Sequence, residues 1–271
     1  MNNYFTTFKI NDHIYQIKDA MGVLTTLIIG KDKALLIDTG YGLYNLKEYI
    51  SHITSLPLIV VASHGHMDHT GGNYLFDQVY IDEKDMNLCM KHNSKLWRQN
   101  EINTAINLNL IDDTFKQENF LKQREGNPIP LKPNQEFDLG HILVLTIPME
   151  GHTKGSTGFY LKEDKILVVA DATCPFVWLF LDESTTVSTY ITMLERILKL
   201  DFNYILLGHG QGKLLPKSKV YDFLEVARHI DLKSSVKVSF KNFEDSNSYC
   251  YTNGIMYNQD DTGIVFDPNK L

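Results

Sequence analysis

The sequence predicts an α/β fold in which two sheets stack face to face and helices cover their outer sides. Two observations lead to this prediction. Short apolar runs bounded by glycine and charged turn residues, which are typical of strands, occur in both halves of the 271-residue chain. Each half also follows the same coarse order of strands, a polar loop and a helix, although no sequence repeat is visible. Because stacked sheets need helices over their outer faces, we expect residues 1–271 to form one domain.

The first half begins with a strand-rich region. Its expected strands are apolar runs, at 24–29, 34–37, 58–62 and 79–81. The turn Gly30-Lys31-Asp32-Lys33 joins the first two as a hairpin. Apolar residues at helical spacing predict a helix within 43–56, and another is expected to begin at Asp82 or Glu83, because acidic side chains favour a helix N-terminus.

Residues 84 to about 130 differ from their surroundings. They are polar, rich in Asn, Lys and Gln, and carry scattered large apolar residues, a pattern that predicts an insertion of one to three helices. Pro128, Pro130 and Pro133 end the segment. Two roles remain open for this insertion: a wall of a substrate site, or a surface lobe without contact to it.

The second half returns to strands and helices. The expected strands are at 142–147, 157–161, 166–170 and 203–207, with one or two closing strands within 249–266. Helices are expected at 188–200, where apolar residues share one face, and at 218–230.

Composition excludes several classes of function. The net charge is −7, which argues against nucleic acid or an anionic membrane as a partner. No apolar run approaches the roughly 18 residues of a membrane-spanning helix, and Met1–Lys9 lacks the features of a signal peptide. Three widely spaced cysteines suggest no disulfide framework. We therefore expect a cytoplasmic protein that acts on a small molecule.

The segment Ser63-His64-Gly65-His66-Met67-Asp68-His69-Thr70 is the strongest functional signal. It places three imidazoles and one carboxylate within six residues, directly after a buried strand and before Gly71-Gly72. Buried polar side chains need partners, and a metal ion would supply one. Imidazole and carboxylate are ligands for zinc and its neighbours, so the segment predicts a metal site on a loop that leaves a strand.

Four more polar residues follow predicted strands: Asp38, His152, Asp171 and His209. Open sheets place their sites at the carboxyl ends of strands, so these residues could converge with the histidine loop. The candidate ligands are then His64, His66, Asp68, His69, His152, Asp171 and His209. Seven are too many for one ion and fit two, with Asp171 shared. Zinc is the first expectation, and the ligand types leave iron and manganese open.

The order of these motifs resembles the metallo-β-lactamase superfamily. The matching blocks are His-x-His-x-Asp-His, Gly-His-Thr-x-Gly-Ser, Ala-Asp-Ala and Gly-His-Gly, together with Asp38-Thr39-Gly40 and Gly71-Gly72-Asn73. The resemblance implies a four-layer αββα sandwich with a dinuclear site at one edge. It implies that His64, His66 and His152 bind the first metal, that Asp68, His69 and His209 bind the second, and that Asp171 bridges them. Asp38 would orient a ligand histidine from outside the site.

Sequence details favour one branch of that family. The block around Gly151-His152-Thr153 is similar to the glyoxalase II and lactonase branches, although Met149-Glu150 separates Pro148 from Gly151. Asp171 argues against the exported β-lactamases, which commonly have cysteine in that role. His66 argues against the flavodiiron branch, whose pattern has glutamate there. The acidic charge and the lack of a nuclease insertion argue against RNA processing.

The expected activity is that of a metal-dependent hydrolase. A hydroxide held by two metal ions would attack the carbonyl of an ester, thioester or lactone, and Asp68 would orient this nucleophile and shuttle its proton. The alternative is a phosphodiesterase-type phosphoester hydrolase on the same site. A β-lactamase and a non-catalytic metal-binding module are weaker alternatives.

Other residues carry less specific signals. The aromatic run Phe176–Phe180 fits a pocket wall, a contact in a homodimer, or core packing. Tyr190, Tyr249 and Tyr251 are among fourteen tyrosines, any of which could stabilise an oxyanion. Five histidines match no motif and are expected to have surface or core roles: His13, His52, His92, His141 and His229.

Overall fold

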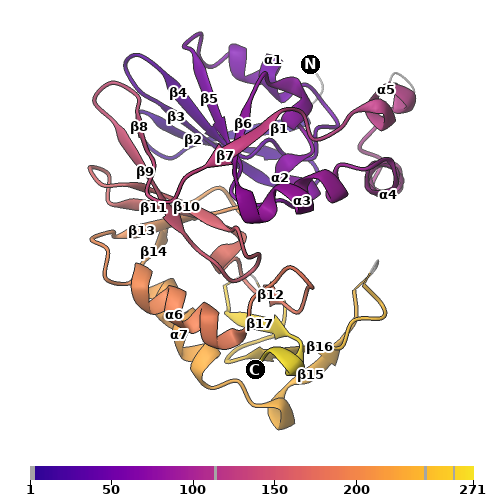
Figure 1. Cartoon of the computed structure of the whole chain (residues 1–271), viewed down its shortest axis with the longest axis vertical. Coiled ribbons are helices and arrows are strands. Elements are labelled where there is room, and N and C mark those ends of the chain that lie inside the picture. Colours follow the sequence, from indigo (N-terminus) through magenta and orange to yellow (C-terminus); the bar gives the residue numbers. More distant parts are fainter. Residues whose placement is uncertain (1–3, 113–114, 241–242, 259) are drawn as a thin grey trace.

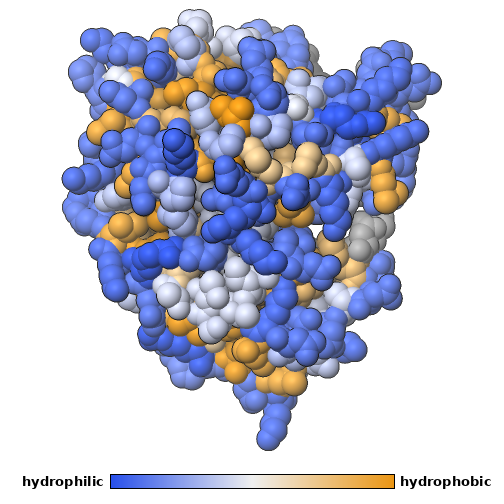
Figure 2. All heavy atoms as spheres, viewed as in Figure 1, coloured by the Kyte–Doolittle hydropathy of each residue, from blue (hydrophilic) through white to orange (hydrophobic). Residues whose placement is uncertain are grey.

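A computed structural model of the chain describes residues 4–112, 115–240, 243–258 and 260–271. Two mixed sheets stack against each other in the upper and middle parts of Figure 1, and helices lie on their outer sides. The predicted fold class is therefore confirmed. A hydrophilic surface covers most of the face seen in Figure 2, where apolar residues gather in separate patches. Within the described ranges, no helix has the length and apolar character needed to cross a bilayer.

The first sheet has seven strands in sequence order. It is antiparallel from β1 to β4 and parallel from β4 to β7. Its strands are β1 (Phe5–Lys9), β2 (Ile14–Asp19), β3 (Leu24–Ile29), β4 (Ala34–Ile37), β5 (Leu58–Val61), β6 (Val79–Asp82) and β7 (Pro128–Leu131).

The second sheet has six strands, and only β11 and β13 are parallel neighbours in it. Its spatial order is β14 (Leu215–Pro216), β13 (Tyr204–Leu207), β11 (Ile166–Ala170), β10 (Thr157–Leu161), β9 (Leu143–Pro148) and β8 (Glu136–Asp138). The predicted hairpin at 157–161 and 166–170 is confirmed residue for residue.

Apolar side chains fill the space between the two sheets. Ile28 and Leu35 of the first sheet pack in one buried cluster with Phe159, Val168 and Leu206 of the second. Burying such a side chain contributes about 1.5–3 kcal/mol. Stacking is thus the arrangement that removes both inner faces from water.

Helices cover the outer faces. Leu46 and Ile50 of α1 pack over the first sheet, and Leu194 and Phe223 pack from α6 and α7 over the second. The α-helices are α1 (Leu46–Ser51), α2 (Met67–Thr70), α3 (Glu83–His92), α4 (Lys95–Asn107), α5 (Gln117–Lys122), α6 (Val187–Ile197) and α7 (Ser218–Arg228). Four short 3₁₀ helices are η1 (Asn73–Leu75), η2 (Asp171–Thr173), η3 (Leu232–Ser234) and η4 (Pro268–Lys270). Helix α3 begins at Glu83 with Asp82 as its N-cap, as predicted.

The insertion at 84–130 contains α3, α4 and α5, which agrees with the expected one to three helices. Pro128 and Pro130, which were expected to end the segment, lie in strand β7. This strand pairs with β6 alone and forms the edge of the sheet. Proline is tolerated at an edge, where its missing N–H leaves no ladder bond unmade.

A third, four-stranded sheet was not predicted. One or two closing strands were expected within 249–266, and the two found there, β16 and β17, join two further strands instead of extending a large sheet. Its order is β12 (Val177–Leu179), β17 (Gly263–Phe266), β16 (Ser248–Thr252) and β15 (Val236–Val238). In Figure 1 it lies in the lower part of the molecule, beside α6 and α7.

Candidate metal centre

All seven predicted ligands lie together at one edge of the stacked sheets. The histidine loop leaves β5, and the other residues follow β9, β11 and β13. Gly65 permits the loop to approach α3 closely, because a Cβ at this position would lie 2.7 Å from the backbone oxygen of Asp85. The ends of four strands therefore bring distant parts of the chain to a single point, in the way that open sheets form their sites.

The side chains form two clusters. In the first, Nδ1 of His66 lies 3.1 Å from Nε2 of His64 and 3.0 Å from Nε2 of His152. All ligand atoms in each cluster lie within 4.8 Å of one another. Three imidazole nitrogens that converge in this way present lone pairs to the space between them, which suits a cation.

The second cluster contains Asp68, His69, Asp171 and His209. Nε2 of His209 lies 3.2 Å from Oδ2 of Asp68 and 3.2 Å from Oδ2 of Asp171. Nε2 of His69 and Oδ1 of Asp171 are buried without a hydrogen-bond partner. Buried polar atoms without partners are costly, and a cation between them would remove that cost. The donor set therefore fits metal ions, while the sharing of Asp171 between two ions stays a prediction.

The electrostatics of the first cluster favour neutral ligands. Burial and the neighbouring histidines hold the pKa of His64 well below its usual value. Burial, together with the charge of His66, lowers the pKa of His152 to about 4. Both rings are therefore neutral at pH 7, the form in which imidazole binds a metal.

In the second cluster, the electrostatics favour a protonated histidine beside ionised carboxylates. Burial alone would lower the pKa of His209, but the carboxylates of Asp171 and Asp68 outweigh it and raise this pKa to about 10. Burial likewise opposes ionisation of Asp68 and Asp171, yet the charges of His69 and His209 hold both carboxyl pKa values well below the usual range. A proton on His209 thus balances carboxylates that a metal ion would otherwise neutralise.

Asp38 lies behind the second cluster. Its Oδ2 accepts hydrogen bonds from Nδ1 of His69 at 2.8 Å and from Oγ of Ser63 at 2.8 Å, and its Oδ1 accepts one from the backbone N–H of Ser63 at 2.6 Å. These contacts leave Nε2 of His69 free to face Asp68 and Asp171. The geometry is the one expected of a residue that orients a ligand histidine.

Two other carboxylates near the centre were missed by sequence reasoning. Oε1 of Glu183 lies 2.8 Å from Nε2 of His66. Asp85 accepts hydrogen bonds from the backbone N–H of Gly65 at 2.9 Å and from Oγ1 of Thr153 at 2.6 Å, so it ties together the two loops that carry His64, His66 and His152. Each partner is far away in the chain, and no local motif signals either contact.

His92 was expected to have a surface or core role, but it lies at the site and forms, with His66 and Glu183, a third group that could hold a metal ion. Its ring stacks on Trp97, with centroids 3.9 Å apart, and on His66, with centroids 4.9 Å apart. His92, Trp97 and Glu101 line a cavity of about 430 Å³ that also contacts His66, Asp68, His152 and Asp171. The insertion therefore borders the site, and the alternative of a surface lobe without contact to it is wrong.

The aromatic run Phe176–Phe180 takes part in two of the roles considered for it. Phe176 and Trp178 line the same cavity, whereas Phe176 and Phe180 also pack in a buried cluster with Val265. The backbone oxygen of Trp178 accepts a hydrogen bond from Nδ1 of His152 at 2.9 Å. The run thus lines the cavity and also packs in the hydrophobic core, and a homodimer contact stays a prediction.

Comparison with known proteins connects this site to a family. The model of the metallo-beta-lactamase superfamily matches residues 19–209. A human protein named acyl-coenzyme A thioesterase MBLAC2 is 24% identical over 205 residues, which cover 71% of this chain and 72% of that protein. "Probable metallo-hydrolase YqgX" of Bacillus subtilis is 26% identical over 145 residues, or 53% of this chain and 63% of that one. The solved structure of a metallo-beta-lactamase from Pontibacter korlensis superposes with a TM-score of 0.60 at 18% identity, covering 83% of this chain and all of that one.

Proposed function

Because the chain belongs to the metallo-beta-lactamase superfamily and is one of its metallo-hydrolases, we propose that it hydrolyses thioesters at a centre of two divalent metal ions, zinc in the first place. The observation that carries the proposal is the complete set of histidine and aspartate ligands in two adjoining clusters. Among carbonyl substrates, the thioester is favoured because bovine and human relatives carry the name acyl-coenzyme A thioesterase. Esters and lactones share the same carbonyl chemistry and form the comparison set, and a glyoxalase II-like or lactonase-like branch stays a prediction.

The two clusters divide the proposed ligands. His64, His66 and His152 would hold one ion, Asp68, His69 and His209 the other, and Asp171 would serve both. Divalent ions bound in this way supply Lewis acidity, which polarises a carbonyl and lowers the pKa of a coordinated water toward about 7.

Asp68 is the proposed proton carrier. Its Oδ2 lies 3.4 Å from Nε2 of His69 and 3.2 Å from Nε2 of His209, and its side chain lines the cavity where a substrate would lie. The charge of His69 and the hydrogen bond from His209 keep the pKa of Asp68 low despite burial, so the group is ionised at neutral pH. An ionised carboxylate at this position would accept a proton from the attacking water at Oδ1, the oxygen left when Oδ2 faces the metal beside His69 and His209, and would return it to the leaving sulfur.

A substrate panel tests the proposed reaction. The zinc-loaded protein is assayed with an acyl-coenzyme A, a thioester of glutathione, a carboxylic ester, a lactone, bis-p-nitrophenyl phosphate and nitrocefin. We expect kcat/KM for a thioester to exceed the others by about 100-fold, or about 2.7 kcal/mol in transition-state binding. Faster turnover of the phosphodiester would instead favour the phosphodiesterase alternative.

Substitutions test the proposed centre. H66A and D171A should abolish both bound metal, measured by elemental analysis, and hydrolysis, because each removes a ligand. H229A is the matched control, since this exposed histidine is the C-cap of α7 and belongs to neither cluster. Hydrolysis that persists in metal-free H66A would refute the mechanism.

A further inference from the structure

The metal centre has a second cavity beside it. This lysine-side cavity, of about 380 Å³, is lined by Lys213 and Lys219 at one end and by Phe240 and Tyr257 at the other. The cavity of about 430 Å³ described above is called the helix-side cavity here, because α3 and α4 border it. Five residues line both cavities: Cys174, Pro175, Phe176, Trp178 and His209. The two cavities therefore adjoin along one wall, with the proposed ligand His209 in it.

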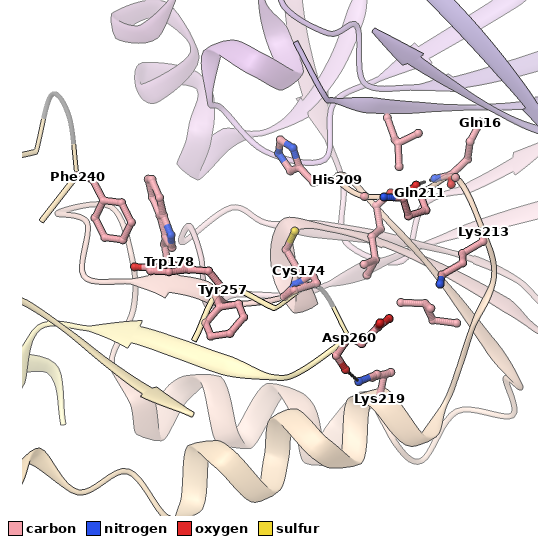
Figure 3. A pocket seen from close by; sticks show the side chains of 17 residues that line it. Gln16, Cys174, Trp178, His209, Gln211, Lys213, Lys219, Phe240, Tyr257 and Asp260 are labelled. Atoms are coloured by element: carbon pink, nitrogen blue, oxygen red, sulfur yellow. Dashed lines mark hydrogen bonds between the residues drawn. The ribbon is translucent and has the colours of Figure 1, made fainter. Parts of the chain in front are cut away.

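Figure 3 shows how the lysine-side cavity is divided. Trp178, Phe240 and Tyr257 lie together on the left of the view, Lys213 and Lys219 lie on the right, and His209 lies between and above them. A molecule in this cavity would therefore meet His209 between an aromatic end and a cationic end.

The two cavities differ in charge. Among the described residues, the helix-side cavity is lined by the carboxylates of Asp68, Glu101 and Asp171 and by no lysine or arginine. The lysine-side cavity has Lys213, Lys219 and one carboxylate, Asp260. Lys219 donates a hydrogen bond to the backbone oxygen of Asp260, whereas the side chain of Lys213 is exposed. Apart from the proposed metal ligands, the lysine-side cavity thus has two cations against one carboxylate and the helix-side cavity has Glu101, so the lysine-side cavity suits an anion that lies away from the metals.

A thioester has two arms, one on each side of the reacting carbon. Hydrolysis forms a bond from that carbon to the water oxygen, breaks its bond to sulfur and leaves the proton on the thiol. Both arms must be bound while the carbon lies at the metal centre, and two adjoining cavities provide two places for them.

On the basis of the proposed thioester hydrolysis, we propose that the lysine-side cavity binds a long thiol arm that carries phosphate groups, as in coenzyme A, and that the helix-side cavity binds the acyl chain. Lys213 pairs with the phosphate groups, because it is an exposed cation at the end of the cavity opposite the aromatic residues. The acyl chain packs on Trp97, Trp178 and Phe243, away from the lysines. The reverse arrangement would bring phosphates near Glu101, the carboxylate of the helix-side cavity that is not a proposed metal ligand, and away from both lysines.

The first experiment compares two thioesters with the same acyl group, one of coenzyme A and one of N-acetylcysteamine, which lacks the phosphates. We expect K213E to raise KM for the coenzyme A thioester about fivefold, and KM for the other by less than twofold, since reversing one exposed charge has a modest effect. K162E is the matched control, because it makes the same charge change at an exposed turn residue that lines neither cavity. Equal changes for both thioesters, or none for either, would overturn the assignment of Lys213.

A binding measurement separates this inference from the proposed activity. Desulfo-coenzyme A is titrated into the zinc-loaded wild-type protein and K213E, with desulfo-pantetheine as the ligand without phosphates. We expect about fivefold weaker binding of desulfo-coenzyme A to K213E and a binding constant for desulfo-pantetheine that changes less than twofold. If the protein hydrolyses no thioester, the proposed function fails; if it does but binds desulfo-coenzyme A equally in both forms, only the inference fails.

Two phenylalanines test the position of the acyl chain. Phe243 lines the helix-side cavity and Phe240 the lysine-side cavity, and both pack on Trp178, with centroid distances of 5.9 and 4.5 Å. With N-acetylcysteamine thioesters, F243A should raise the ratio of KM for dodecanoyl to KM for acetyl about tenfold, whereas F240A should change it less than twofold. The opposite result would place the acyl chain in the lysine-side cavity and overturn the proposal.

Discussion

Oε1 of Glu183 lies 2.8 Å from Nε2 of His66, and this contact links a loop before α6 to the histidine loop after β5. The other ring nitrogen of His66 faces His64 and His152. Burial would raise the pKa of Glu183, but the hydrogen bond and charge of His66 outweigh it and lower this pKa to about 2. Glu183 is therefore an anion at neutral pH and selects the ring orientation in which Nδ1 of His66 points at the proposed first metal.

E183Q should weaken the proposed first metal site. The amide keeps the shape of the side chain but lacks the charge that polarises His66, so we expect a 10- to 100-fold loss of metal affinity or activity. Competition with a chromophoric chelator measures the affinity. The control is D182N, because the neighbouring Asp182 is exposed and does not contact His66. Equal affinities for E183Q and D182N would show that Glu183 has no such role.

D38N should affect the second site selectively. An amide can accept at only one of the two oxygen positions, so its NH₂ group would face either the backbone N–H of Ser63 or Nδ1 of His69, and we expect His69 to lose its fixed orientation and metal affinity to fall 10- to 100-fold. Asparagine tolerates the left-handed backbone of Asp38, whose φ is 67°, so the fold should survive. Elemental analysis after dialysis against a weak chelator should find one metal equivalent fewer than in the wild type. The same metal content in both proteins would contradict this expectation.

Local patterns explain why much of the fold and the position of the site could be predicted. The hairpin of β10 and β11 is formed by neighbouring segments of the chain, two apolar runs on either side of a charged turn. The polar residues that meet at the centre each follow such a run, so the rule that sites form at strand ends was enough to group them.

The contacts that were missed depend on residues far apart in the sequence. Glu183 and His66 are separated by 117 positions, and a single sequence contains no signal that pairs them. The third sheet was missed for the same reason, because its three-residue strand β12 pairs with β17 near the C-terminus. Strand β7 was not predicted because it contains two prolines, which are compatible with a strand here because the strand lies at the edge of its sheet.

R98A should destabilise the protein more than any surface change in the insertion. Arg98 is fully buried, and its Nη2 donates to the backbone oxygen of Gly71 at 3.0 Å and to Oδ1 of Asn93 at 2.7 Å. It thereby connects α4 to the segment that follows the proposed metal ligands His64, His66 and His69. Burial lowers the pKa of Arg98 to about 10, so the group stays charged at neutral pH. Its loss leaves buried acceptors without donors, and we expect the free energy of unfolding to fall by about 3 kcal/mol.

Urea denaturation of the metal-free protein measures this loss. R124A is the matched control, because Arg124 belongs to the same insertion but its side chain is exposed and bonds only to nearby backbone oxygens. We expect R124A to change the free energy of unfolding by less than about 0.5 kcal/mol. R98K should recover only part of the loss, since an ammonium lacks the planar fork of a guanidinium. Equal stabilities of R98A and R124A would disprove the role of Arg98.

D19N should stabilise the metal-free protein at neutral pH and not at low pH. Oδ1 of Asp19 accepts hydrogen bonds from the backbone N–H groups of Gly22 and Val23 at 2.8 and 3.0 Å, and Val23 in turn forms a β-bridge with His209. Burial outweighs these hydrogen bonds and raises the pKa of Asp19 to about 6. Between pH 4 and pH 6 the folded state therefore binds more protons than the unfolded state, so the contribution of Asp19 to stability falls as the pH rises through this window. The full loss above pH 6 is about 3 kcal/mol, and asparagine avoids it while keeping an acceptor for Gly22 and Val23.

Urea denaturation at pH 4 and pH 7 measures the difference in the free energy of unfolding between D19N and the wild type. We expect the advantage of D19N to be larger at pH 7 than at pH 4. An advantage that is the same at both pH values, or reversed at pH 7, would rule this account out.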